Sequence, residues 1–358
     1  MRSPPQPVRA DLAAVARELR TALLGWYDGA RRRLPWRALP GEQAEPWRVL
    51  VSELMLQQTT VATVRGRFLP FLARFPTVQA LAQAPLDEVL HAWQGLGYYR
   101  RARALHACAR AVVERHDGTL PLDLEPLAAL PGLGPYTAAA VAAIAGDRPV
   151  VPVDANVERV LARMLALDRP AAQARPQLRQ AAAALAAPER AADLAQAVME
   201  LGALVCTPRR PRCLACPWRA WCRAAATGEP ERYPPPARRK ERAVRFATAC
   251  ALQRRDGAVL FRRRPDTGLL AGLIELPTGE WSTDAATAAA PEGLPAAASL
   301  APLPGSVRHL FPHIDLTLRV MRGSVQGGEG LWVPPARFDS LALPTLTRKL
   351  LRHAGLAG

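Results

Sequence analysis

Lysine is nearly absent from this chain of 358 residues: it occurs only at Lys240 and Lys349, so arginine supplies almost all of the positive charge. Long apolar runs are also missing, and none approaches the roughly 20 residues that cross a bilayer. The N-terminal residues lack the apolar core of a secretion signal. We therefore expect a cytoplasmic protein that has no membrane partner.

The balance of charge is strongly positive. The chain holds 47 Lys and Arg against 31 Asp and Glu, which gives a formal net charge of +16 and a pI near 10.8. Such a charge implies an acidic partner, most simply nucleic acid, although an anionic membrane surface would also attract it. The length and the hydrophobic content of 49% suit two or three globular domains.

Four of the six cysteines fall within seventeen residues, in the spacing C-x6-C-x2-C-x5-C. They are Cys206, Cys213, Cys216 and Cys222. In a chain without an export signal, such a group indicates a metal site rather than disulfides. Zinc sites usually combine two short Cys-x-x-Cys arms, whereas this compact run is typical of an iron–sulfur loop. We predict a 4Fe-4S cluster held by residues 206–222, and expect Cys108 and Cys250 to be plain buried thiols.

A turn rich in Pro and Gly joins two helical patterns at residues 130–136. Gly132 and Gly134 permit positive φ and expose backbone N–H groups, and such a turn at a helix N-terminus can bind phosphate. A purely structural turn between two helices would use the same residue types. We predict that both glycines contact a nucleic-acid backbone.

Glu53 lies within a helical pattern that predicts one helix over residues 47–64, and its neighbours three and four positions away are mostly apolar. Burial disfavours a charged carboxylate and raises its pKa, which is the property that a general acid needs. An ordinary helical glutamate that reaches solvent is the alternative. Gln58 and Thr59, near the end of the pattern, can read base edges but are equally common at helix ends.

Asp154 directly precedes an apolar helical stripe that begins at Val157. Capping of that helix is the plain interpretation. Alternatively, the carboxylate stays ionised beside the helix N–H groups and faces a developing positive charge. Glycosidic bond cleavage uses two carboxyl groups whose pKa values are pushed apart, and Glu53 and Asp154 would form such a pair.

These motifs together resemble the helix-hairpin-helix DNA glycosylases of the endonuclease III superfamily over roughly residues 10–225. The segments most similar to the MutY family of adenine glycosylases are residues 34–37, 52–59 and 95–99. In bifunctional relatives the hairpin ends in a lysine that forms a Schiff base with the sugar, and Tyr136 stands at that position here. The resemblance therefore implies a monofunctional glycosylase. One minor departure is Ala155, where the family usually has glycine.

The resemblance also implies the roles of individual residues. Glu53 would protonate adenine at N7 and later activate water, and Asp154 would stabilise the oxocarbenium ion, with Tyr136 and Asn156 hydrogen-bonded around them. Residues matching the loop near the extruded adenine are Arg32, Leu34, Trp36 and Arg37. Residues matching those near the opposing 8-oxoguanine are Gln58, Thr59, Tyr98, Phe311 and His313. The base must leave the duplex because its reacting atoms are inaccessible within the stack.

A Pro-rich, charged linker is predicted over residues 226–242, and strand patterns follow it. We expect a hairpin around Asp256-Gly257, strands at 244–252, 258–262, 314–321 and 331–333, and a helix at 345–354. This order resembles the Nudix-like C-terminal domain of MutY. The acidic metal-binding helix of Nudix hydrolases is missing, so we do not expect pyrophosphate hydrolysis.

The expected fold is a mainly α catalytic region, residues 1–225, joined to a smaller α+β Nudix-like domain, residues 243–358. The expected partner is double-stranded DNA that contains adenine opposite 8-oxoguanine or guanine, bound by a monomer. A glycosylase for damaged pyrimidines and a catalytically silent iron–sulfur DNA-binding module are the alternatives. Tyr136 argues against the first, and the presence of Glu53 and Asp154 argues against the second.

One departure from the family generates a prediction. The family loop that inspects 8-oxoguanine reads Phe-Ser-His, whereas this chain has Phe311-Pro312-His313. Proline supplies neither a hydroxyl nor a backbone N–H, so two potential donors are lost. We expect a weaker preference for adenine opposite 8-oxoguanine over adenine opposite guanine than the family loop would give. Pro312→Ser should raise the ratio of the two cleavage rates by about 3- to 10-fold, and equal ratios in both proteins would contradict this.

Overall fold

A computed structural model describes residues 12–237, 241–295 and 299–356. The chain forms two compact units, each described here by itself. The first comprises the described residues of 1–83 and 104–238, and the second those of 84–103 and 239–358. Residues 84–103 thus group with the C-terminal residues, whereas the sequence-based division placed them in the N-terminal region. Part of the predicted linker, residues 238–240, lies outside the described residues.

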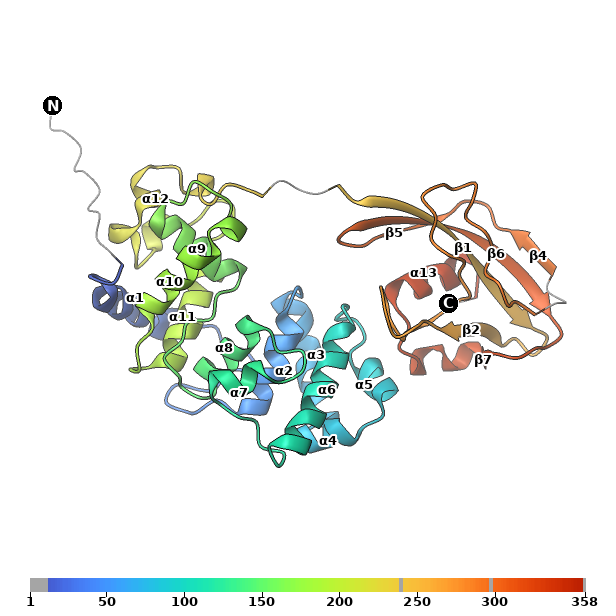
Figure 1. The fold of residues 1–358 in the computed structure, drawn as a ribbon, viewed down its shortest axis with the longest axis horizontal. Coiled ribbons are helices and arrows are strands. Elements are labelled where there is room, and N and C mark those ends of the chain that lie inside the picture. The colour runs from blue at the N-terminus through green and yellow to red at the C-terminus, as the bar shows by residue number, and fades with distance from the viewer. Residues whose placement is uncertain (1–11, 238–240, 296–298, 357–358) are drawn as a thin grey trace. The chain divides into compact units, whose positions relative to one another are not determined.

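The first unit is helical (Figure 1). Its helices are α1 (Ala16–Ala30), α2 (Pro46–Leu56), α3 (Val61–Arg74), α4 (Val78–Gln83), α6 (Arg100–Arg115, which begins in the second unit), α7 (Leu124–Ala128), α8 (Pro135–Ile144), α9 (Ala155–Leu165), α10 (Arg175–Leu185), α11 (Ala191–Leu204) and α12 (Arg223–Ala226). Within the described part of the chain, none of the helices has the length and apolar character needed to cross a membrane.

Helix α8 is the centre of this unit. Its residues from Thr137 to Ile144 are all buried, and α2, α7 and α11 pack against it. Small alanine side chains let these helices approach closely, so that side chains on α2 and at the start of α8 can meet. The turn before α8 requires a glycine, because Gly132 has φ +76° and an added Cβ would lie 2.3 Å from the Cβ of Ala104.

The single helix predicted over residues 47–64 is wrong. The chain leaves α2 after Leu56, and Gln58 adopts the left-handed conformation with φ +54°. Helix α3 then starts after Thr60, whose side chain accepts a hydrogen bond from the backbone N–H of Thr63. The N-cap preference of Thr60 therefore outweighs the continuous apolar pattern, and residues 57–59 lie in a loop.

The second unit contains helix α5 (Leu86–Ala92) and a mixed sheet covered by helix α13 (Thr345–His353) (Figure 1). Its strands are β1 (Ala243–Arg254), β2 (Val259–Arg263), β3 (Ile274–Glu275), β4 (Ser299–Pro302), β5 (Val307–Leu310), β6 (Ile314–Val325) and β7 (Leu331–Val333). The order is β3-β2-β1-β6-β4, with β5 also paired to β6 and β7 to β2. Strands β1 and β6 are parallel, and the other pairs are antiparallel.

The predicted hairpin at Asp256-Gly257 is confirmed, because β1 and β2 pair around this turn and Gly257 has φ +85°. The four predicted strands and the final helix are confirmed as well. The core lies between the sheet and α13, which contributes Leu346, Leu350 and Leu351. The chain therefore has the mainly helical N-terminal region and the smaller α+β C-terminal domain that the sequence predicts.

Candidate functional site

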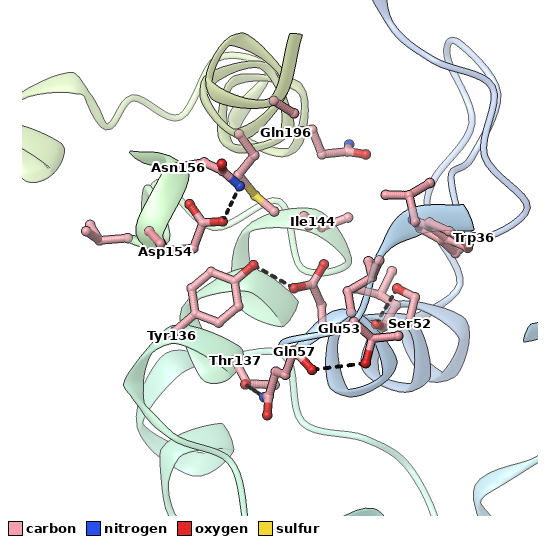
Figure 2. A pocket seen from close by; sticks show the side chains of 18 of the residues that line it. Trp36, Ser52, Glu53, Gln57, Tyr136, Thr137, Ile144, Asp154, Asn156 and Gln196 are labelled. Carbon is pink, nitrogen blue, oxygen red and sulfur yellow. Dashed lines mark hydrogen bonds between the residues drawn. The ribbon is translucent and has the colours of Figure 1, made fainter. Parts of the chain in front are cut away.

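A cavity of about 920 Å³ opens among α2, the turn before α8, α9 and α11 in the first unit. The predicted site residues that line it are Arg32, Leu34, Trp36, Arg37, Glu53, Gln58, Thr59, Gly132, Gly134, Tyr136, Asp154 and Asn156. Side chains from segments more than 100 residues apart in sequence thus face one space (Figure 2). Tyr98, Phe311 and His313 are not among the lining residues; they belong to the second unit.

Glu53 is held on α2 as a buried acid. Its side chain is only 4% exposed and lies among apolar residues of the same helix, such as Leu50 and Leu54. The hydroxyl of Tyr136 donates a hydrogen bond of 2.8 Å to its Oε2. Burial raises the pKa of Glu53 to about 7, although the Tyr136 hydrogen bond opposes the rise. The alternative of a solvent-facing helical glutamate is wrong.

Asp154 caps α9 and at the same time faces the cavity. Its Oδ1 accepts the backbone N–H of Val157 at 2.7 Å, and its Oδ2 accepts Nδ2 of Asn156 at 2.9 Å. These two hydrogen bonds hold the carboxyl group at the start of the helix. The capping interpretation and the mechanistic one are therefore compatible, because the capping carboxyl group also lines the cavity.

The two carboxyl groups have unequal environments on one cavity. Figure 2 shows Glu53, Tyr136, Asp154 and Asn156 converging there, with Tyr136 and Glu53 joined by their hydrogen bond. The negative charge of Asp154 adds to the rise in the pKa of Glu53. Burial, together with both carboxylates, raises the pKa of Tyr136 well above its usual value, so this hydroxyl remains a donor. The site can thus hold a proton and a negative charge side by side.

Glu200 is a site residue that the sequence analysis missed. It projects from α11, is 1% exposed and lines the same cavity. Its Oε1 accepts the backbone N–H and Nε of Arg32 at 3.0 and 2.7 Å, and its Oε2 accepts Nη2 of Arg32 and Nη2 of Arg37 at 2.7 and 2.9 Å. Burial alone would raise the pKa of Glu200, but these hydrogen bonds hold it at about 2.

The position of Glu200 has a sequence signal. An acidic residue stands between Ala197 and Leu201 on an apolar helical stripe, which is the same signal that identified Glu53. The ion pairs fix the loop that carries Arg32 and Arg37 against the cavity. Within this loop the ring of Trp36 is 8% exposed and contacts Phe68 edge to face, with ring centroids 5.5 Å apart.

Hydrogen bonds connect the cavity to the four-cysteine loop. Asn156, which binds Asp154, accepts Nη2 of Arg159 through its Oδ1 at 2.9 Å. The same guanidinium donates to the carbonyl of Gly202 at 2.9 Å and to the carbonyl of Cys206 at 2.8 Å. Sequence analysis missed Arg159, because nothing in its local pattern distinguishes it from a solvated helical arginine.

The four predicted metal ligands line one small cavity together with Arg163. All four are free thiols, and the buried Arg163 donates to Sγ of Cys206 at 3.3 Å and to the carbonyl of Thr207 at 2.7 Å. Among the residues that the structure describes, no three His, Cys, Asp or Glu side chains form a group that could hold a metal ion. Four cysteines on one cavity are nevertheless the donor type and number that an iron–sulfur cluster uses.

The start of the predicted linker packs near this loop. The carboxylate of Glu231 accepts the backbone N–H of Arg210 at 2.8 Å, and Arg163 donates to the carbonyl of Tyr233 at 3.0 Å. Residues 229–233 therefore belong structurally to the first unit. Cys108 and Cys250 are buried free thiols, as expected.

The remaining predicted site residues lie in the second unit. Tyr98 is 40% exposed, has φ +47° and stacks with the guanidinium of Arg101 at 5.5 Å. His313 is exposed at the turn between β5 and β6, whereas Phe311 is 9% exposed and packs into the core of the sheet. A direct contact of Phe311 with DNA stays a prediction.

Comparisons with known proteins agree with this architecture. Residues 51–185 match the family described as HhH-GPD superfamily base excision DNA repair protein, and residues 248–353 match the NUDIX domain. The human adenine DNA glycosylase is 36% identical over 416 residues, which cover 96% of this chain and 74% of the relative. The adenine DNA glycosylase of Mycolicibacterium smegmatis is 47% identical over 210 residues, covering 58% of this chain and 70% of the relative. A solved structure of a thermostable thymine-DNA glycosylase superposes with a TM-score of 0.54 at 26% identity, covering 61% of this chain and 100% of that one.

The buried charge of Glu200 yields a prediction about stability. Glu200→Gln leaves two arginines without their carboxylate and should lower the free energy of unfolding by about 3 kcal/mol at pH 7. Because the pKa of Glu200 is depressed to about 2 in the folded state, its contribution is complete above about pH 4.5 and is lost as the pH falls towards 2. Urea unfolding of both proteins at pH 7 and at pH 3.5 measures this difference.

Asp193→Asn is the matched control, since Asp193 lies on the same helix and pairs with the more exposed Arg190. We expect it to cost less than about 1 kcal/mol. A Glu200→Gln protein as stable as the unsubstituted chain at pH 7 would show that the ion pairs add nothing to the fold.

Proposed function

The chain belongs to the family of adenine DNA glycosylases, enzymes of base excision repair, and from that premise we propose that it removes adenine mispaired with 8-oxoguanine or guanine. It does so as a monofunctional enzyme that hydrolyses the N-glycosidic bond of a nucleotide flipped out of the duplex. The observation that carries this proposal is the pair of carboxyl groups with unequal environments on one cavity.

The chemistry follows from that inequality. Glu53 gives its proton to N7 of adenine, and the bond between C1′ and N9 breaks with its electron pair passing to the base. The resulting oxocarbenium ion is stabilised by the carboxylate of Asp154, which the N–H groups of α9 and Asn156 hold in place. Glu53, now ionised, takes a proton from water as the oxygen adds to C1′. The products are free adenine and an abasic sugar, and Glu53 has its proton again.

Strand cleavage is not part of this reaction. A lyase of this superfamily uses a lysine amine to form a Schiff base with the opened sugar. The sequence has no lysine before Lys240, and Tyr136 donates its hydroxyl to Glu53 instead. This argues against a glycosylase with lyase activity on damaged pyrimidines.

The loop of residues 32–37 provides the adenine-binding wall of the cavity. Leu34 and Trp36 offer apolar surface to the faces of the base, while Arg32 and Arg37 are oriented by Glu200. A carboxylate that already accepts four hydrogen bonds fixes both guanidinium groups, so the loop is organised before a base enters.

We assign a 4Fe-4S cluster to Cys206, Cys213, Cys216 and Cys222. When bound, the cluster ties the loop of residues 206–222 together through iron–thiolate bonds. Arg163 donates to Cys206 Sγ and to neighbouring carbonyls, which neutralises negative charge at the ligands. The backbone of the DNA would contact Gly132, Gly134 and the arginines in and beside the cysteine loop, which are Arg209, Arg210, Arg212, Arg219 and Arg223.

The second domain, residues 243–358, would examine the base opposite adenine through His313. Gln58, Thr59 and Tyr98 match family residues that approach this base, and the catalytic domain would comprise residues 1–225. Residues 226–242 would link the two. We propose a monomer that acts in the cytoplasm on DNA. The acidic helix of Nudix hydrolases is absent from the sequence, so the second domain binds rather than hydrolyses.

A single-turnover assay tests this function. Duplexes with adenine opposite 8-oxoguanine, guanine or thymine are incubated with the enzyme, and strand breakage is scored with and without alkali. Breakage of the two mispaired duplexes only after alkali is expected. Direct breakage would favour a lyase, and no base release would favour a silent DNA-binding module. Glu53→Gln should slow release by at least about 100-fold while duplex affinity stays within about a few-fold.

Glu158→Gln is the matched control for that substitution. Glu158 lines the same cavity and pairs with Arg175, whereas Glu53 accepts its hydrogen bond from Tyr136. Its substitution should leave base release close to normal. Equal losses in both variants would mean that removal of any carboxylate from this cavity is harmful, and that Glu53 is not the acid.

The pH dependence of base release tests the Tyr136 contact. Release requires protonated Glu53, so its rate should fall as the pH rises through about 7. The hydrogen bond from the Tyr136 hydroxyl lowers the pKa of Glu53. In Tyr136→Phe the fall in rate should therefore occur at a higher pH, and the maximal rate should also decrease. Tyr27→Phe is the control, because that hydroxyl has no hydrogen-bond partner among the described residues. If the fall in rate at high pH occurs at the same pH in Tyr136→Phe, the Tyr136 hydroxyl does not influence the pKa of the catalytic acid.

A further inference from the structure

The turn of residues 311–313 rests on a stack of side chains inside the second unit. The ring of Phe311 lies over the ring of Trp281, with centroids 6.0 Å apart and an interplanar angle of 24°. The ring of His309 also contacts the ring of Phe311, edge to face, with centroids 4.6 Å apart. Phe311 is 9% exposed, whereas Pro312 and His313 are exposed. Phe311 is therefore the buried residue that holds the turn in place, and Pro312 and His313 form its exposed tip.

Trp281 is itself held in place. The guanidinium of Arg264 lies over its ring at 5.7 Å. Nη1 of Arg264 donates to Oε2 of Glu275 at 2.7 Å, and Nε of Arg262 donates to Oε1 of the same carboxylate at 3.0 Å. Glu275 is 4% exposed. The ion pair with the buried Glu275 thus fixes Arg264. The guanidinium of Arg264 lies over the ring of Trp281, and this ring stacks against Phe311.

The backbone of the turn is fixed at its two ends. The N–H of Phe311 donates to the carbonyl of Ile314 at 2.8 Å, and the N–H of Ala243 donates to the carbonyl of His313 at 2.9 Å. Nε of Arg242 donates to the carbonyl of Phe311 at 3.0 Å. Pro312 brings a fixed φ and no N–H. The tip therefore offers few donors, and its recognition of a base depends on where the turn holds His313.

We propose that Trp281 is a positioning residue for recognition of 8-oxoguanine: it acts through Phe311 to place the tip at Pro312 and His313. This rests on the proposed function, in which the second domain examines the base opposite adenine. Phe311 then contributes as a buried anchor. Because an ordered turn loses less conformational freedom on binding, the stack strengthens lesion binding without touching the lesion.

The experiment measures dissociation constants for duplexes with a noncleavable adenosine analogue opposite 8-oxoguanine or guanine. In Trp281→Ala the preference for 8-oxoguanine should fall by about 3- to 10-fold, the worth of one aromatic pair. Trp281→Phe keeps a ring under Phe311 and should restore most of the preference. The same ratio taken from single-turnover rates on cleavable duplexes should change in parallel.

Trp332→Ala is the matched control. Trp332 belongs to the same domain and also stacks with an arginine, Arg254, at 5.2 Å, but it packs in a separate small cluster. Its substitution should leave the preference unchanged. An unchanged preference in Trp281→Ala, or an equal fall in Trp332→Ala, would overturn the role of Trp281 while leaving the glycosylase function intact. No preference in the unsubstituted chain would overturn lesion recognition and this inference with it.

Discussion

A carboxylic acid that is removed from water gives up its charge unless something compensates for the lost hydration. Glu53 is in this position, because α2 buries it against α8 and the hydroxyl of Tyr136 donates one hydrogen bond to it. One hydrogen bond does not offset the burial, so the pKa of Glu53 rises to about 7 and part of the population keeps its proton near neutral pH. The proton that the proposed cleavage needs would therefore be available because of packing.

Two other carboxyl groups on the same cavity accept more hydrogen bonds than Glu53 does. Asp154 receives donors from the start of α9, and Glu200 receives four hydrogen bonds from two arginines. Glu200 is thus buried with a lowered pKa, whereas Glu53 is buried with a raised pKa. The pKa values of Glu53 and Glu200 differ because Glu53 accepts one hydrogen bond from Tyr136, whereas Glu200 accepts four from arginines.

The second unit uses buried charge for a different purpose. Glu275 and its two arginines carry no role in the proposed chemistry, yet they hold the aromatic stack beneath an exposed turn. A fold of one kind can support different functions, because function depends on the residues of a site and not on the fold alone. This sheet presents the turn of residues 311–313 at a defined position.

The sequence by itself determined the features that depend on neighbours along the chain. Cysteine spacing, the Pro-Gly turn, the apolar neighbours of Glu53, the capping position of Asp154 and the alternating strands are all local patterns. The fold class followed from the family that these motifs resemble. Even there, local rules competed, since Thr60 broke a helix that the apolar pattern extended. Only the tertiary structure decided which distant groups meet. Glu200 bonds to Arg32 across 168 residues, Arg159 to Cys206 across 47, and the ring of Trp281 lies against Phe311. No local pattern encodes such pairs, because they depend on how helices and strands pack after they have formed.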